Sequence, residues 1–185
     1  YTTGAIIADC TVAFLAYSDV YIYETVDQHL GSALGNRAAT TSQCETDYIV
    51  RELDVGCNNF VALLAYSDDT GVIDIPSNYG LPSEAAIILT DDTSVADDWS
   101  DFIDNVPPKA ILEGAVNFPD FIVYSGFQEG GALSTEGNCL DWASGGAPEW
   151  GAIGIWAGWA NDWGDSSSSC TNPAAARRFI CMCWE

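Results

Sequence analysis

The chain has 185 residues, of which 27 are acidic and five are Lys or Arg, so its formal net charge is −22. Such a chain offers no basic face to phosphates, which argues against nucleic acid and anionic membranes as partners. No stretch approaches the roughly 20 uninterrupted apolar residues of a membrane helix, which argues against membrane insertion. A hydrophobic content of 48% indicates a globular chain, and the length fits one domain.

The first half of the chain predicts two strands, a helix and a further strand. Residues 11–17 and 20–26 are rich in β-branched and aromatic residues and are separated by Ser18-Asp19, a turn signal. Residues 38–52 form a helix-compatible run, with Thr40 or Thr41 as its N-cap. Residues 60–67 are an apolar, strand-like run.

The second half predicts a loop, followed by an amphipathic helix. Residues 74–82 are punctuated by two prolines and a glycine, which is typical of a loop. Residues 91–104 alternate acids with apolar residues whose spacing indicates one buried helical stripe. That stripe comprises Val95, Trp99, Phe102 and Ile103. The acids of this segment are expected to face water.

Seven cysteines with a single histidine indicate an oxidising compartment and disulfide bonds. A zinc site is disfavoured, because Cys181 and Cys183 flank only Met182 and no C-x-x-C spacing occurs. An odd number leaves one cysteine over. That cysteine is either a buried, inert thiol or the link to a second chain.

The order of several motifs resembles the endostatin-like branch of the C-type lectin-like fold. These motifs are a helix-like segment with Cys44, the run at residues 60–67, Asn138-Cys139-Leu140-Asp141-Trp142, Cys170, and Arg178-Phe179-Ile180-Cys181. The resemblance implies an α+β fold with a small twisted antiparallel sheet, two helices and a long-loop region. It places this domain at residues 20–185 and leaves residues 1–19 as an N-terminal strand extension.

The same resemblance implies two nested disulfides, Cys139–Cys170 and Cys44–Cys181. The second would tie the first helix to the last strand, and closing so long a loop is worth about 4 kcal/mol or more in the chain-entropy model. Three cysteines then remain, of which two can pair and one must be over. They are Cys10, Cys57 and Cys183.

Residues 145–164 carry an unusual density of tryptophan among glycines and alanines. In the family this stretch forms long loops between the two cysteines of the inner disulfide. The four tryptophans are Trp150, Trp156, Trp159 and Trp163. They either fill a core beneath the loops, or form a contact surface for a protein partner or for stacking against sugar rings.

Calcium is the candidate cofactor, because sugar-binding C-type lectins hold it with a Trp-Asn-Asp strand motif and a Glu-Pro-Asn or Gln-Pro-Asp loop. This chain has an interrupted copy of the strand motif, Trp159-Ala160-Asn161-Asp162, and neither loop tripeptide. Asn161, Asp162 and Asp165 are the candidate ligands, since calcium prefers oxygen donors.

No catalytic motif accompanies these features, so no enzyme is expected. His29 is the only histidine and has no serine or cysteine in a nucleophile context, and the acid clusters fit a solvated face. We therefore expect a secreted or cell-surface, disulfide-bonded protein that assembles with itself or another surface protein as a structural or adhesive subunit. The alternative is a lectin-like module that binds a carbohydrate or protein ligand through the tryptophan-rich region, with or without calcium.

Overall fold

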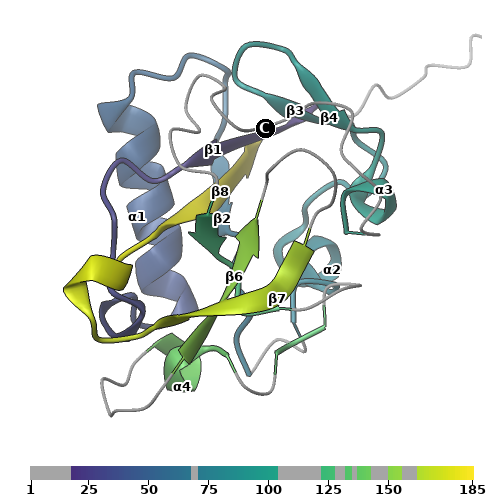
Figure 1. Ribbon diagram of the computed structural model, residues 1–185. Helices are drawn as coiled ribbons and strands as arrows, with labels where there is room; N and C mark the ends of the chain where they lie inside the picture. The colour runs from purple at the N-terminus through teal and green to yellow at the C-terminus, as the bar shows by residue number, and fades with distance from the viewer. Residues whose placement is uncertain are drawn as a thin grey trace, which may run out of the picture.

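The protein is described here by a computed structural model covering residues 18–67, 71–103, 122–127, 132–134, 137–142, 150–155 and 162–185. It is a mixed α+β structure in which helices lie on both faces of an open sheet (Figure 1). The expected α+β class is therefore present. The strand expected at residues 11–17 lies outside the described residues.

Within the described residues the sheet contains eight strands, and four helical segments and two short 3-10 turns surround it. The strands are β1 (Val20–Glu24), β2 (Asn59–Ala62), β3 (Ile87–Leu89), β4 (Ser94–Ala96), β5 (Ile122–Tyr124), β6 (Trp150–Ile155), β7 (Asp162–Ser169) and β8 (Arg178–Trp184). The helical segments are α1 (Arg37–Val50), α2 (Ile75–Tyr79), α3 (Trp99–Ile103) and α4 (Cys139–Trp142), with turns η1 (Gly31–Ala33) and η3 (Pro173–Ala175).

The last strand, β8, lies at the centre of the sheet. The strand order is β4-β3-β1-β8-β5-β6-β7, and β2 also pairs with β8. The β1–β3 and β5–β8 pairs are parallel, so the expectation of an antiparallel sheet is wrong for these pairs. A parallel pair needs a long crossover, and the chain between β1 and β3 supplies one through α1, β2 and α2.

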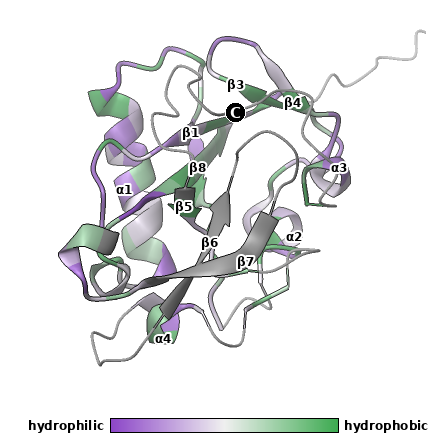
Figure 2. Ribbon diagram, in the orientation of Figure 1, coloured by the Kyte–Doolittle hydropathy of each residue, from purple (hydrophilic) through white to green (hydrophobic). Residues whose placement is uncertain are grey.

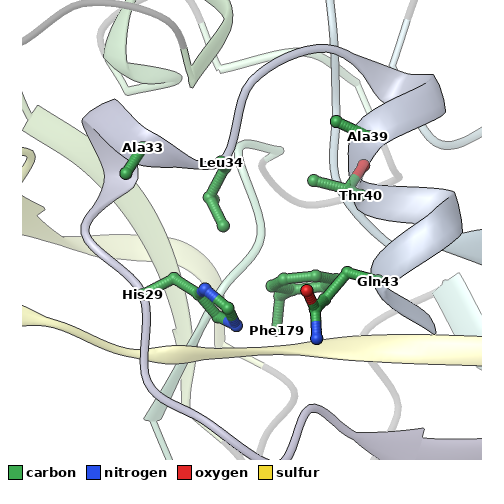
Figure 3. A pocket seen from close by; sticks show the side chains of 7 residues that line it. All are labelled: His29, Ala33, Leu34, Ala39, Thr40, Gln43 and Phe179. Carbon is green, nitrogen blue, oxygen red and sulfur yellow. The ribbon is translucent and has the colours of Figure 1, made fainter. Parts of the chain in front are cut away.

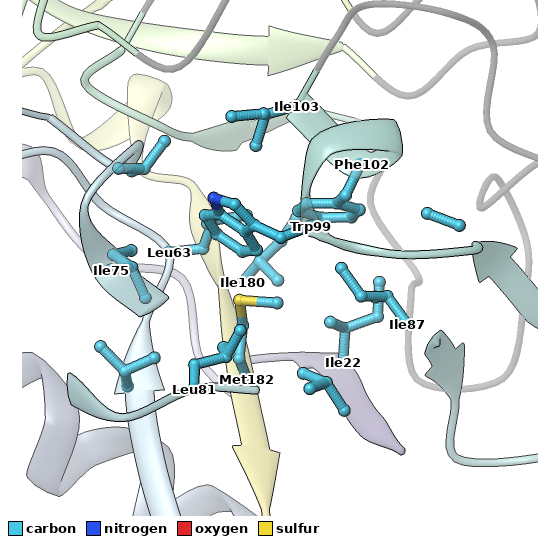
Figure 4. Packing of buried hydrophobic residues seen from close by; sticks show 14 of the residues in the cluster. Ile22, Leu63, Ile75, Leu81, Ile87, Trp99, Phe102, Ile103, Ile180 and Met182 are labelled. Carbon is cyan, nitrogen blue, oxygen red and sulfur yellow. The ribbon is translucent and has the colours of Figure 1, made fainter. Parts of the chain in front are cut away.

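Alternate residues of β8 contribute to two hydrophobic cores on opposite faces of the sheet. Ile180 and Met182 contribute to the core beside α2 and α3, which also contains Trp99 and Phe102 (Figure 4). The intervening residues of β8 contribute to the other core, on the side of α1. They are Phe179, Cys181 and Cys183. This alternation is the two-residue period of a strand that is buried on both faces.

Helix α1 contacts the sheet mainly through polar groups. Its buried residues are Arg37, Thr40, Cys44 and Asp47, and Figure 2 shows hydrophilic residues along much of the helix. The guanidinium of Arg37 donates to the carbonyl of Ala62 at 2.6 Å. The hydroxyl of Tyr23 donates to the carbonyl of Cys44 at 2.8 Å. These bonds compensate for much of the burial of polar groups, so the helix rests against the sheet without an apolar stripe.

The start of α1 differs from the expected one. Asn36 is the N-cap, and its side chain accepts a hydrogen bond from the backbone N–H of Ala39. Thr40, which was expected as one of two possible caps, is buried instead, with its hydroxyl 3.0 Å from the hydroxyl of Tyr66. Asparagine and threonine are both good caps. Thr40 is buried against the sheet within the helix, so the helix begins earlier, with Asn36 as its cap.

Two further expectations about local structure are wrong. The segment expected to be a loop contains α2, with Pro76 in its first turn and Gly80 in the left-handed region at its end. Proline and glycine therefore mark the two ends of a helix here. Residues 91–104 are not one helix, because Val95 lies in β4 and the helix α3 begins at Trp99. The apolar residues of the expected stripe are nevertheless all buried.

Gly126 and Gly80 offer a matched pair of substitutions. Both have a left-handed φ, +71° and +73°. A Cβ on Gly126 would lie 2.6 Å from Cζ2 of Trp142, whereas a Cβ on Gly80 would meet nothing within 4 Å. We expect Gly80→Ala to lower the free energy of unfolding by about 1 kcal/mol, and Gly126→Ala by about 3 kcal/mol or more.

Chemical denaturation of the oxidised proteins, followed by circular dichroism, measures both losses. Equal losses for the two variants would show that Trp142 does not occupy the space above Gly126.

Candidate functional site

Three disulfides connect the described parts of the chain. Cys44–Cys181 and Cys139–Cys170 are the two pairs that the resemblance implies, and Cys57 pairs with Cys183. Six of the seven cysteines are thus bonded to one another. The seventh, Cys10, lies outside the described residues, and no other cysteine among these 185 residues is left to pair with it.

The motif around Cys139 forms a left-handed turn. All four residues of α4 have positive φ values, between 48° and 61°. A left-handed conformation costs roughly 1–2 kcal/mol per residue, so the surroundings must hold the turn in place. The indole N–H of Trp142 donates to the carbonyl of Ala65 at 2.9 Å, and the N–H of Gly35 donates to the carbonyl of Trp142 at 2.9 Å.

The carboxylate of Asp141 also holds this turn. It accepts hydrogen bonds from the backbone N–H of Ser67 at 2.8 Å, from the hydroxyl of Ser67, and from the side-chain amide of Asn138 at 2.7 Å. Leu140 is left at the tip with 63% of its surface exposed. Asp141 therefore has a structural role in fixing the turn against the chain that follows β2.

The tryptophan-rich region contains paired strands where loops were expected. β6 and β7 are antiparallel, with Trp150 opposite Ser169 and Trp163 opposite Gly154. Only Ile153-Gly154-Ile155 in β6 alternates as a strand does, and the second half of β7 is serine, so glycine and serine obscured both strands in the sequence. Trp156, Trp159 and Asn161 lie outside the described residues, in the connection between these strands.

The candidate calcium ligands fall on or beside the same hairpin. Asp162 begins β7 and Asp165 lies within it, while the side chains of both lie outside the described part of the chain. Within the described residues, no group of three or more His, Cys, Asp or Glu side chains is arranged to hold a metal ion. No helix in that part of the chain is long and apolar enough to cross a membrane.

A pocket of about 190 Å³ lies between α1, the segment around η1 and the start of β8. Its lining residues are His29, Ala33, Leu34, Ala39, Thr40, Gln43 and Phe179. Figure 3 shows His29 and Gln43 pointing toward one another from opposite walls, with the ring of Phe179 between them. These residues come from three separate elements, so only the fold brings them together.

The backbone of His29 is fixed, while part of its side chain lacks a partner. Its N–H donates to the carbonyl of Arg177 at 2.8 Å, and its carbonyl accepts from the N–H of Arg177 at 3.0 Å. The ring lies 5.5 Å from the ring of Phe179. Its Nε2 atom is buried and has no hydrogen-bond partner among the described residues. Such an atom is a candidate for contact with a ligand.

Burial lowers the pKa of His29 below its ordinary value of 6.5, although Asp47 and Asp27 act to raise it. The imidazole is therefore neutral at pH 7 and presents one donor and one acceptor nitrogen. In the sequence His29 was considered as a zinc ligand and as a catalytic base, and neither possibility pointed to a pocket. A lone histidine between unremarkable segments gave no signal for this pocket.

Comparisons with known proteins add nothing to this picture: no protein-family model matches the chain, and no curated protein matches it significantly.

The depressed pKa of His29 predicts a pH dependence of stability. The unfolded chain takes up a proton near pH 6.5, and the folded protein does so only at lower pH. The neutral imidazole of His29 therefore makes its full contribution to the free energy of unfolding above about pH 6.5. That contribution is lost as the pH falls from there through the folded-state pKa of His29. We expect His29→Gln to remove this part of the pH dependence.

Urea denaturation of both proteins between about pH 7.5 and pH 5 measures the difference, and an NMR titration of the imidazole gives the pKa directly. A pKa at or above 6.5, or identical pH dependence in the two proteins, would contradict the burial of His29.

Proposed function

We propose that this chain is a secreted, non-catalytic domain of the endostatin-like C-type lectin-like fold, which assembles with copies of itself into an extracellular structural or adhesive layer. The observation that carries this proposal is the pairing of six cysteines with one another, which leaves Cys10 without a partner among these 185 residues. In an oxidising compartment a surplus cysteine is suited to a bond between chains.

The sequence around Cys10 supports assembly by strand addition. Residues 11–17 read Thr-Val-Ala-Phe-Leu-Ala-Tyr and directly precede the described domain. This composition favours a strand, and seven residues match the length of a typical sheet edge. An apolar strand next to a surplus cysteine can both pair with a neighbouring copy and bond to it covalently.

The open sheet supplies an edge for that strand. β7 ends the strand order, and among the described residues it pairs only with β6. It is eight residues long and carries no lysine or proline, although Asp162 and Asp165 give this edge two charges. Main-chain hydrogen bonding to such an edge is a known mode of association between chains. We therefore place residues 11–17 of one copy against β7 of the next.

The fold assignment rests on the order of elements and cysteines. The helix that carries Cys44 is bonded to the last strand, and Cys139 and Cys170 form a shorter loop nested inside that one. This is the nesting that the resemblance implies. The extracellular location rests on the three disulfides, which persist in oxidising surroundings.

Assembly predicts an oligomer that depends on Cys10 and on the apolar segment. Native mass measurement, with and without reductant, should show covalent oligomers for the parent chain and none for Cys10→Ser. Phe14→Asp should weaken the non-covalent association that remains, because a charge would enter the strand interface. Thr3→Ser is the matched control and should leave the mass unchanged. A monomer under every condition would refute assembly.

A second candidate function is ligand binding by the β6–β7 hairpin, since Trp150 lies in β6, Trp163 lies in β7, and the other two candidate tryptophans fall between them in the sequence. In this case calcium should shift tryptophan fluorescence, and Asp162→Asn should abolish the shift. Asp92→Asn is the control, because Asp92 is exposed near the opposite edge of the sheet. A shift that survives Asp162→Asn, or no shift at all, would count against calcium at this hairpin.

A further inference from the structure

We propose that the pocket beside His29 binds a small neutral ring that carries hydroxyl groups, such as a single monosaccharide unit. This site is separate from the sheet edge and the β6–β7 hairpin, so the inference does not depend on either proposed function. It rests on the size of the pocket, the hydrogen-bonding groups that face it, and the chemistry of its lining.

The volume suits one ring. The pocket measures about 190 Å³. A cavity of about 150 Å³ is enough to hold benzene, whereas drug-sized ligands occupy roughly 300–1,000 Å³. The pocket therefore accommodates a six-membered ring with small substituents. The ring of Phe179 and the side chain of Leu34 supply apolar surface for the faces of such a ring.

Two polar groups face the pocket from opposite sides (Figure 3). One is His29, whose Nε2 has no hydrogen-bond partner among the described residues and is covered from solvent, so a ligand hydroxyl reaches it once the imidazole turns toward the pocket. The other is Gln43, whose amide nitrogen donates to Oδ1 of Asp47 at 2.9 Å. That bond fixes the orientation of the amide and leaves its carbonyl oxygen as an acceptor on the pocket side. Asp47 is itself fixed, because its Oδ2 accepts from the N–H of Val26.

Hydroxyl groups satisfy this arrangement better than other small polar groups. A hydroxyl both donates and accepts, so it can bond to Nε2 of neutral His29 in either tautomer. A second hydroxyl can donate to the carbonyl oxygen of Gln43. A ligand with hydroxyls on opposite sides of one ring can reach both groups, which is the common geometry of a monosaccharide.

The lining also selects for a neutral ligand. None of the seven lining residues is an Asp, Glu, Lys or Arg, although the chain has 27 acidic residues. A carboxylate or phosphate would enter without a counter-charge and against a net charge of −22. Free amino acids and sugar acids are therefore disfavoured.

The entrance lies where η1 faces the first turn of α1. Ala33 and Ala39 line the pocket and are exposed, so a ligand can reach it from solvent without displacing a core residue. This placement gives a clean blocking substitution. Ala39→Leu adds three carbons at the rim, whereas Ala38→Leu adds them to an exposed neighbour on the same helix that does not line the pocket.

The test is an NMR titration of the uniformly ¹⁵N-labelled full chain with glucose, galactose, N-acetylglucosamine and myo-inositol, to tens of millimolar. We expect at least one neutral probe to give saturable shifts at the amides of His29, Ala39 and Gln43. Ala39→Leu should weaken that binding about tenfold or more, and Ala38→Leu should leave it unchanged. Glucuronate should bind more weakly than its neutral counterpart glucose.

A second variant separates hydrogen bonding from shape. His29→Phe keeps a ring over Phe179 but removes Nε2, so binding should weaken about tenfold while the spectrum elsewhere stays that of the folded parent. The inference is overturned if no neutral probe gives saturable shifts, if the shifts lie on the β6–β7 hairpin, or if Ala39→Leu binds as the parent does. Equal binding of glucuronate and glucose would overturn its selectivity for neutral ligands.

Discussion

The structure depends on the position of β8, the last strand of the chain, at the centre of the sheet. Three strands bond to it: β1 along one side, and β2 and β5 along the other. Cys181 and Cys183 project from the same face of β8, and their disulfides close loops with sequence separations of 137 and 126 residues. The central strand therefore follows every other described strand in the sequence, and the sheet cannot close until β8 has been synthesised. Such long-range strand pairing is slow to form. Once the two disulfides have formed, they stabilise the fold by restricting the unfolded chain.

Because a disulfide attaches α1 to β8, the buried side of α1 does not need a continuous apolar surface to hold the helix on the sheet. A helix held to the sheet only by packing needs an apolar stripe, whereas α1 buries Arg37, Thr40 and Asp47 around the bonded Cys44. Each of these groups has a specific partner, so the helix is held at defined points and does not fill all of the space beside it. The pocket lies in this remaining space, and the bonds that fix α1 also orient Gln43 toward it through Asp47.

The sequence predicted burial better than it predicted secondary structure. The apolar positions at Val95, Trp99 and Phe102 are buried as their spacing indicates, although they belong to a strand and a short helix. The spacing of apolar residues indicates which side chains are buried. In a short segment the same spacing is compatible with a strand or with a helix. Asn36 is a good local cap and Pro76 suits a first turn, but a cap at Thr40 and a loop fitted the local pattern equally well, so tertiary contacts decide. The pocket was beyond prediction for the same reason, since His29 and Phe179 are far apart in the sequence.

The Cys139–Cys170 disulfide lies where the β6–β7 hairpin meets the segment that forms one wall of the His29 pocket. Cys170 directly follows β7, and its carbonyl accepts a hydrogen bond from the N–H of Ser32 in η1 at 3.1 Å. Gly31, also in η1, lies so close to the sulfur of Cys139 that a Cβ there would overlap it, and its N–H donates to the hydroxyl of Tyr124 at 3.2 Å. The end of the β6–β7 hairpin and one wall of the His29 pocket therefore share the same support. The left-handed turn at Cys139 is unfavourable on its own. The contacts that fix the end of the hairpin and the wall of the pocket therefore also hold this turn in place.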